Sequence, residues 1–136
     1  MSKIEQTLSI IKPDAVERNL QDQIKNEFKN NGFEVLKEKK IHISKEEAEK
    51  FYKVHESKPF YNDLCAYLSS GPIVVMNLQR ENAVLENRKL MGATNPLDAE
   101  EGTLRKKYGI SIDKNSVHGS DSVENARIEL DFFFKD

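Results

Sequence analysis

The 136-residue sequence contains a single cysteine, Cys65. One cysteine excludes an intrachain disulfide and every zinc site built on paired cysteines. No apolar run reaches the length of about 20 residues that spans a membrane. The first residues lead into a polar-interrupted segment, unlike the apolar stretch of a signal peptide. Glycine and proline are scarce and form no linker, and there is no internal repeat. We therefore predict one soluble, cytoplasmic domain over residues 1–136.

An excess of charge of one sign is also missing. The 21 Lys and Arg residues and 23 Asp and Glu residues give a net charge of −2 at pH 7. A general nucleic-acid-binding protein needs a basic excess to displace counterions from phosphates, so the balance argues against that class. It does not exclude a small anionic ligand, because a few converging cations suffice. Apolar residues, 38% of the total, recur along the whole length and predict an ordered core.

Three familiar nucleotide-binding patterns are absent. The sequence has no Gly-x-x-x-x-Gly-Lys-Ser/Thr loop, no Gly-x-Gly-x-x-Gly turn and no Asp-Phe-Gly segment. Any nucleotide site must therefore be built from side chains. Carboxylates do not cluster at chelating spacing, so we predict no metal ligand in the protein itself, and Mg²⁺ would arrive on the phosphates of a substrate.

Hydrophobic periodicity predicts an alternation of strands and helices. Residues 7–11 and 33–43 alternate, residues 73–76 form a short apolar run, and residues 130–134 are a further strand candidate. Stripes at helical spacing predict helices from Leu20 to Phe28, from Ser44 to His55, from Tyr61 to Leu68, from Asn82 to Leu90 and from Asp121 to Ala126. The order indicates a β-α-β-β-α-β chain, which is the ferredoxin-like α+β fold with a four-stranded antiparallel sheet covered by helices.

Local signals fix several helix ends and one long connection. Ser44 and Glu47 match a capping box. Asn82 can cap the helix predicted from Asn82 to Leu90, and Gly92 can end it. From residue 93 to residue 115 the periodicity is poor, apart from a helical turn near Leu104. A loop of roughly 20 residues in a small domain is normally functional or disordered.

The strongest candidate for chemistry is the segment Asn115-Ser116-Val117-His118-Gly119-Ser120-Asp121. Gly119 permits a sharp turn beside His118, and Ser120 or Asp121 can cap the following helix, whose free N–H groups favour anions. A neutral imidazole is a competent nucleophile toward phosphorus. Taken alone, however, these residues fit a surface histidine before a capped helix better than a catalytic one. His42 and His55 receive no role.

Other candidates gain meaning only together. Lys12 ends the first strand before Pro13 and can reach a phosphate, and the guanidinium groups of Arg88 and Arg105 suit phosphate oxygens. The remaining candidates are a hydroxyl in the long loop, a phenol near a histidine and an aromatic ring that can stack on a nucleobase, which are Thr94, Tyr52 and Phe60. Each has an ordinary alternative as a solvated or core side chain.

Six blocks of the sequence together resemble the nucleoside diphosphate kinase family. They are Ile11-Lys12-Pro13-Asp14-Ala15, Pro59-Phe60, Ser70-Gly71-Pro72, Met91-Gly92-Ala93-Thr94-Asn95-Pro96, Gly102-Thr103-Leu104-Arg105 and Asn115-Ser116-Val117-His118-Gly119-Ser120-Asp121-Ser122. They stand in the family's order and at its spacing, and the resemblance extends from Gln6 to Phe134.

The resemblance implies a ferredoxin-like fold and a Mg²⁺-dependent ping-pong transfer that maintains nucleotide pools. His118 would take the γ-phosphoryl group from a nucleoside triphosphate, with ATP as the main donor, and pass it to a diphosphate. The resemblance implies that Lys12 would bind phosphate and ribose, and that Arg88, Thr94 and Arg105 would bind the phosphates. It also implies that Phe60 would stack on the base and that Asn115 would bind the ribose. Tyr52 would lie near the phosphoryl site, and Ser120 and Glu129 would orient the imidazole. A homo-oligomer, a tetramer or a hexamer, is also implied.

The sequence departs from the family at two places. Gln79-Arg80 stands where many relatives have Glu-Gly, and a cation there opposes the dipole of the helix that follows. Val54 stands where many relatives have an acidic residue, which would remove one hydrogen-bond partner near Ser120.

Two further functions remain open. The first is a nucleotide sensor that keeps the cationic pocket and needs no histidine. The second is an interaction module, in which the strand 33–43 pairs with another copy.

Overall fold

The strand β1, Ile4–Ile11, lies inside a four-stranded sheet with the order β2-β3-β1-β4. It pairs antiparallel with β3 along its whole length and with β4 over its last three residues, and β2 pairs antiparallel with β3. The predicted α+β fold with a four-stranded antiparallel sheet is therefore confirmed. Two candidate site residues depend on β1 for their positions: Lys12 directly follows it, and His118 is paired with Ile10.

The computed structural model describes residues 3–112 and 114–134. Residues 1–2 and 135–136, which end the predicted domain, and residue 113 of the predicted loop lie outside the described residues. In chain order the elements are β1, α1 Pro13–Glu17, α2 Gln21–Asn30, β2 Glu34–Ile41, α3 Lys45–Phe51, the 3₁₀ turn η1 Lys53–His55, α4 Tyr61–Leu68, β3 Ile73–Glu81, α5 Ala83–Met91, the 3₁₀ turn η2 Pro96–Asp98, α6 Leu104–Tyr108, β4 Val117–Gly119 and α7 Val123–Phe134. Across the described ranges, no helix is long and apolar enough to cross a membrane.

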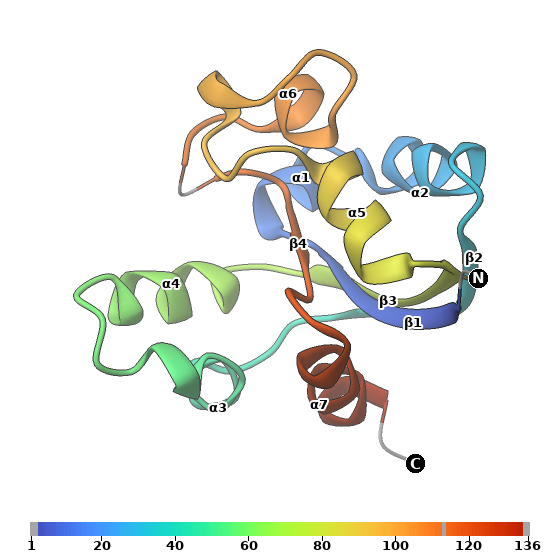
Figure 1. Ribbon diagram of the computed structural model, residues 1–136. Helices are drawn as coiled ribbons and strands as arrows, with labels where there is room; N and C mark the ends of the chain where they lie inside the picture. Colours follow the sequence, from blue (N-terminus) through green and yellow to red (C-terminus); the bar gives the residue numbers. More distant parts are fainter. Residues whose placement is uncertain (1–2, 113, 135–136) are drawn as a thin grey trace.

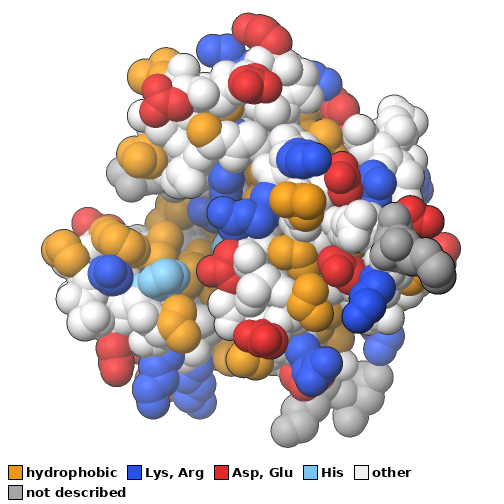
Figure 2. All heavy atoms as spheres, viewed as in Figure 1, with side chains coloured by type: hydrophobic (Ala, Val, Ile, Leu, Met, Phe, Trp, Pro, Cys, Tyr) orange, Lys and Arg blue, Asp and Glu red, His pale blue; other side chains and the backbone are white. Residues whose placement is uncertain are grey.

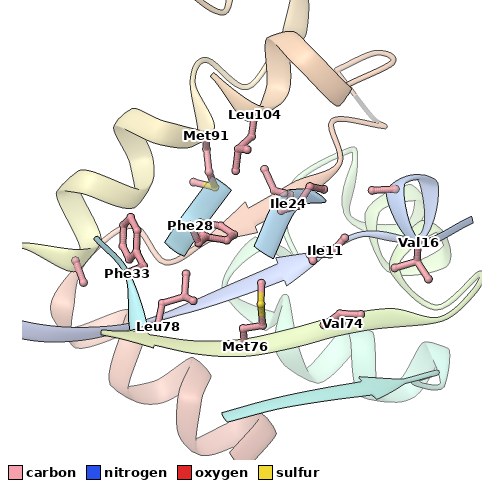
Figure 3. Packing of buried hydrophobic residues seen from close by; sticks show 13 residues of the cluster. Ile11, Val16, Ile24, Phe28, Phe33, Val74, Met76, Leu78, Met91 and Leu104 are labelled. Carbon is pink, nitrogen blue, oxygen red and sulfur yellow. The ribbon is translucent and has the colours of Figure 1, made fainter. Parts of the chain in front are cut away.

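Helices cover both faces of the sheet (Figure 1). On one face, α1, α2, α5 and α6 pack over Ile11, Val74, Met76 and Leu78, and Phe28 of α2 lies close above the strands (Figure 3). On the other face, α3, α4 and α7 cover the residues of opposite parity, which are Leu8, Ile10, Ile73 and Val75. Because successive side chains of a strand point to opposite faces, β1 and β3 contribute to both clusters and are the most enclosed elements.

The predicted helix starts fare differently. At α3 the capping box forms as expected: Ser44 Oγ accepts from Glu47 N at 3.1 Å, and Glu47 Oε1 accepts from Ser44 N at 3.0 Å. Asn82 precedes α5, but it has a left-handed backbone (φ 51°) and its side chain makes no capping bond, so that prediction is wrong. The carboxylate of Glu5 on β1 accepts from Val84 N at 3.3 Å in its place.

The fourth strand is not the predicted one. Residues 130–134 belong to the helix α7, and the strand β4 is the three-residue segment around His118. The buried members of α7 are Ala126, Leu130, Phe133 and Phe134, a spacing of four, three and one that fits a helix and not the alternation of a strand. A three-residue strand is too short to show a period, so the sequence pattern could not reveal β4.

Arg80 does not oppose the dipole of α5 as expected. Its guanidinium lies at the end of α2, where Nη1 donates to Asn31 O at 2.6 Å and the group is 5.3 Å from the ring centre of Phe33. Asn31 follows the last residue of α2, and a cation is favourable at the C-terminal end of a helix. The departure from the family pattern therefore joins β3 to the end of α2.

The packing of α7 can be tested with two neighbouring phenylalanines. We expect Phe133→Ala to lower the free energy of unfolding by about 3–5 kcal/mol, because its ring lies in the core. Phe132 is 38% exposed, so Phe132→Ala should lower the free energy of unfolding clearly less than Phe133→Ala does. Urea unfolding of the two variants measures both values. A strand at this place would put Leu130, Phe132 and Phe134 on the inner face, and would give the reverse order of costs.

Candidate active site

His118 lies in the middle of β4, opposite Ile10 of β1. The pairing brings residue 118 next to the end of β1, although more than 100 residues separate the two segments in the chain. Its side chain is 21% exposed, so the ring is accessible from solvent but held by its surroundings. A histidine on a short strand beside a buried central strand has few ways to move.

One nitrogen of the His118 ring is bound to a carboxylate. The distance from Nε2 to Glu129 Oε1 on α7 is 3.1 Å, and Ser120 Oγ donates to the same oxygen at 2.8 Å. Because the carboxylate only accepts, the proton of a neutral ring lies on Nε2, and the lone pair is on Nδ1. No hydrogen bond to Nδ1 is found within the described part of the chain.

Aromatic rings confine the other sides of the imidazole. The ring of Phe51 lies edge-on at 5.4 Å between ring centres, and that of Tyr52 at 6.4 Å. Burial, followed by the negative charge of Glu129, raises the pKa of the Tyr52 phenol, so this group stays protonated. Phe51 was not identified from sequence as a site residue, because its place on the apolar stripe of α3 resembles ordinary packing.

Lys12 and Asn115 are bound to each other at the start of β4. Lys12 Nζ donates to Asn115 Oδ1 at 2.9 Å, and both residues are buried. The amide nitrogen of Asn115 donates to Thr94 O at 3.0 Å and to Ile112 O at 3.2 Å. The amide of Asn115 thus ties the lysine after β1 to the long loop. The side chain of Thr94 itself is exposed.

Arg105, at the start of α6, is braced by two backbone carbonyls. Nη1 donates to Gly92 O at 3.0 Å and Nη2 to Val117 O at 2.9 Å, next to His118. Burial, and then the charge of Arg88, lower the pKa of Arg105 from its usual 12.5 to about 10. Arg88 is exposed on α5, and its guanidinium has neither a hydrogen bond nor an ion pair with any residue that the structure describes. Two cations that repel each other in this way favour an anion between them.

Phe60 lies at the outer end of a row of rings. It stands just before α4 with 49% of its surface exposed, and its ring centre is 6.0 Å from that of His55. His55 is in turn 6.2 Å from Tyr52, which borders His118. Figure 2 shows a hollow between the lobe of α3 and α4 and the part formed by α5 and α6, where Lys and Arg side chains gather.

Comparison with known proteins decides the family. The family model described as "Nucleoside diphosphate kinase" matches residues 5–136. The chain belongs to the nucleoside diphosphate kinase family. Among the curated nucleoside diphosphate kinases, that of Rhizorhabdus wittichii is 56% identical over 96% of this chain and 94% of its own, and that of Geotalea uraniireducens is 53% identical over 96% of both chains. The crystal structure of the Aquifex aeolicus nucleoside diphosphate kinase superposes with a TM-score of 0.96 at 35% identity, covering 98% of this chain and 96% of that one.

The start of α7 in this nucleoside diphosphate kinase differs from the sequence prediction. The side chain that accepts from a backbone N–H in the first turn of α7 belongs to Ser122 and not to Ser120 or Asp121. Ser122 Oγ accepts from Asn125 N at 3.1 Å. Ser120 is fully buried and binds Glu129 and the backbone of Leu8 instead. Val54 is exposed in η1, and Ser120 keeps these partners without an acidic residue there.

The repulsion between the two arginines of this kinase should appear in its stability. A cation whose folded pKa is lowered costs stability at every pH below about 10, and the cost fades between pH 10 and the usual value of 12.5. Because Arg88 is exposed, we expect Arg88→Gln to stabilise the ligand-free kinase at pH 7 by no more than about 1 kcal/mol and to slow its turnover.

Urea unfolding at low salt measures this difference. Lys89→Gln is the matched control, since Lys89 is exposed on the same helix and faces Glu86 at 3.6 Å. An Arg88→Gln variant that is no more stable than Lys89→Gln would contradict the account.

Proposed function

We propose that this nucleoside diphosphate kinase transfers phosphoryl groups through His118. The observation that carries the proposal is the fixed orientation of the ring: Nε2 faces Glu129, and Nδ1 is left as the nucleophile. Nδ1 attacks the γ-phosphorus of a nucleoside triphosphate, a N–P bond forms, and the bond to the bridging oxygen breaks. The nucleoside diphosphate leaves with that electron pair. A terminal phosphate oxygen of a second diphosphate then attacks the same phosphorus, the N–P bond breaks, and its electron pair returns to Nδ1 to restore the neutral ring.

The hydrogen bond to Glu129 supports both half-reactions. A ring that gains a bond to phosphorus at Nδ1 while keeping its proton on Nε2 becomes positively charged, and a carboxylate 3.1 Å away stabilises that charge. Ser120 Oγ donates to the same oxygen of Glu129 and so helps to keep the carboxylate from rotating away. Under the proposal, Glu129 and Ser120 orient the ring and do not touch the nucleotide.

The cations and the outer aromatic ring account for substrate binding. Lys12, Arg88 and Arg105 would hold the phosphates, Thr94 and Asn115 would add hydrogen bonds to phosphate and ribose, and Tyr52 would border the phosphoryl group. Phe60 would stack on the base, which suits purines and pyrimidines alike because every base has a π-face. The exposure of Phe60 and the arginine-braced backbone beside His118 support this arrangement.

Mg²⁺ fits this site as part of the substrate. No group of three or more His, Cys, Asp or Glu side chains in residues 3–112 and 114–134 is arranged to hold a metal ion. The polar groups near His118 include cations, which match phosphate oxygens. When bound to those oxygens, Mg²⁺ would neutralise part of their charge.

We further propose a homo-oligomer, a tetramer or a hexamer, that works as one domain per chain on the nucleotide pools of the cytoplasm. β2 is an edge strand with many exposed residues, which supports pairing with a second copy. The one cysteine is free and buried, as suits a reducing compartment.

Labelling with γ-labelled ATP tests the histidine route. We expect the wild-type enzyme to acquire a label that is lost in acid and stable in base, because a phosphorus–nitrogen bond has this behaviour. His118→Asn should acquire none. His42→Asn is the matched control, since His42 is exposed and its ring is bonded to Ser69 O at 2.8 Å, far from the candidate site in sequence, and it should label normally. Label that survives acid, or that persists in His118→Asn, would exclude this mechanism.

A further inference from the structure

The carboxylate of Asp14 lies at the centre of a buried network that the proposed chemistry does not use. Asp14 is in the first turn of α1, and its side chain is only 3% exposed. Oδ2 accepts from Ser116 Oγ at 2.8 Å and from Arg18 Nη2 at 3.1 Å, and Oδ1 accepts from the hydroxyl of Tyr67 on α4. Burial and the bond to Asp14 raise the pKa of the Tyr67 phenol, so it remains a donor.

Ser116 has a backbone conformation that a residue with a side chain rarely adopts. Its φ is 73°, in the left-handed region, although it is not glycine. Such a residue persists only when its surroundings hold it. Its hydroxyl has one proton and two acceptors within reach, Asp14 Oδ2 at 2.8 Å and Tyr108 O at 3.0 Å. The ionised carboxylate is the stronger acceptor. Arg18 Nη2 donates to the same hydroxyl oxygen at 3.2 Å.

The backbone at Ser116 sets how the chain enters β4. Ser116 O accepts from Lys12 N at 2.8 Å, and the neighbouring Asn115 holds Lys12 Nζ at 2.9 Å. His118 follows two residues later. A change of conformation at Ser116 would therefore turn the histidine and the lysine relative to each other.

We propose that Asp14 is a positioning residue, which holds Ser116 in the left-handed conformation so that Lys12 and His118 face the same phosphoryl group. This inference rests on the proposed roles of His118 and Lys12. Asp14 touches neither nucleotide nor phosphorus in this scheme, and acts only through Ser116. The alternative is that Asp14 merely joins α1, α4 and the loop, which would affect stability and not the reaction.

The isosteric change Asp14→Asn separates these alternatives. We expect the rate at which His118 is phosphorylated at saturating ATP to fall about tenfold or more, while the KM for ATP changes less than about threefold, because a misplaced nucleophile lowers the chemical step more than binding. Rapid-quench labelling at a temperature well below unfolding measures the rate. Asp22→Asn is the matched control: Asp22 is 87% exposed on α2 and 3.8 Å from Lys25, and its change should leave the rate unaltered.

A pair of changes at Ser116 tests the conformational step even if Asp14→Asn fails to fold. Ser116→Ala and Ser116→Gly both remove the hydroxyl, but only glycine adopts the left-handed region without strain. We expect Ser116→Gly to phosphorylate several-fold faster than Ser116→Ala. Asp14→Asn should also slow the Ser116→Gly enzyme less than it slows the wild type. Equal rates in the two Ser116 variants would overturn the proposal.

The labelling of the wild type keeps this inference apart from the proposed function. If the wild type acquires no label at His118, the proposed function is wrong, whatever Asp14 does. If the wild type is labelled and Asp14→Asn has a lower unfolding free energy but the wild-type rate, only the positioning role is wrong.

Discussion

The ladder between β1 and β4 is the constraint on which the site depends. It joins only three residue pairs, yet it fixes His118 opposite Ile10, beside the lysine that ends β1. β1 itself is buried between two hydrophobic clusters and paired on both sides, so its position is determined by the whole core. A side chain held by such a strand has little conformational entropy to lose when a substrate binds. The remaining parts of the site, on α5, α6 and α7, are added around this fixed point.

The site sets two kinds of electrostatic interaction against each other. On the side of α7, Glu129 Oε1 binds Nε2 of the imidazole and also accepts from Ser120 Oγ, so these groups have partners without a ligand. On the side of α5 and α6, Arg88 and Arg105 repel each other, and burial disfavours the charge of Arg105. Under the proposed function, phosphates between the two guanidinium groups would make that unfavourable arrangement favourable. Relief of the repulsion between the two arginines would then contribute to the free energy of phosphate binding.

Sequence reasoning succeeded where a local pattern has one physical meaning. The capping box at Ser44, the end of α5 at Gly92 and the strands over residues 7–11 and 73–76 all follow from short-range chemistry. It failed where packing decides: residues 130–134 are helical because Phe133 and Phe134 both reach the core, and β4 is too short to carry a period. The family motifs led to His118 and its neighbours, but no spacing could reveal Phe51 against the imidazole or the bonds between Asp14 and Ser116. Those contacts join segments far apart in the chain.

Under the proposed mechanism, one particular nitrogen of His118 carries the phosphoryl group. Glu129 occupies Nε2, so the account requires the bond to form at Nδ1. Nuclear magnetic resonance of the phosphorylated, ¹⁵N-histidine-labelled enzyme identifies the nitrogen directly through its coupling to ³¹P. We expect coupling to Nδ1, with the proton retained on Nε2. Coupling to Nε2 would mean that the ring turns away from Glu129 during the reaction, and would contradict the account.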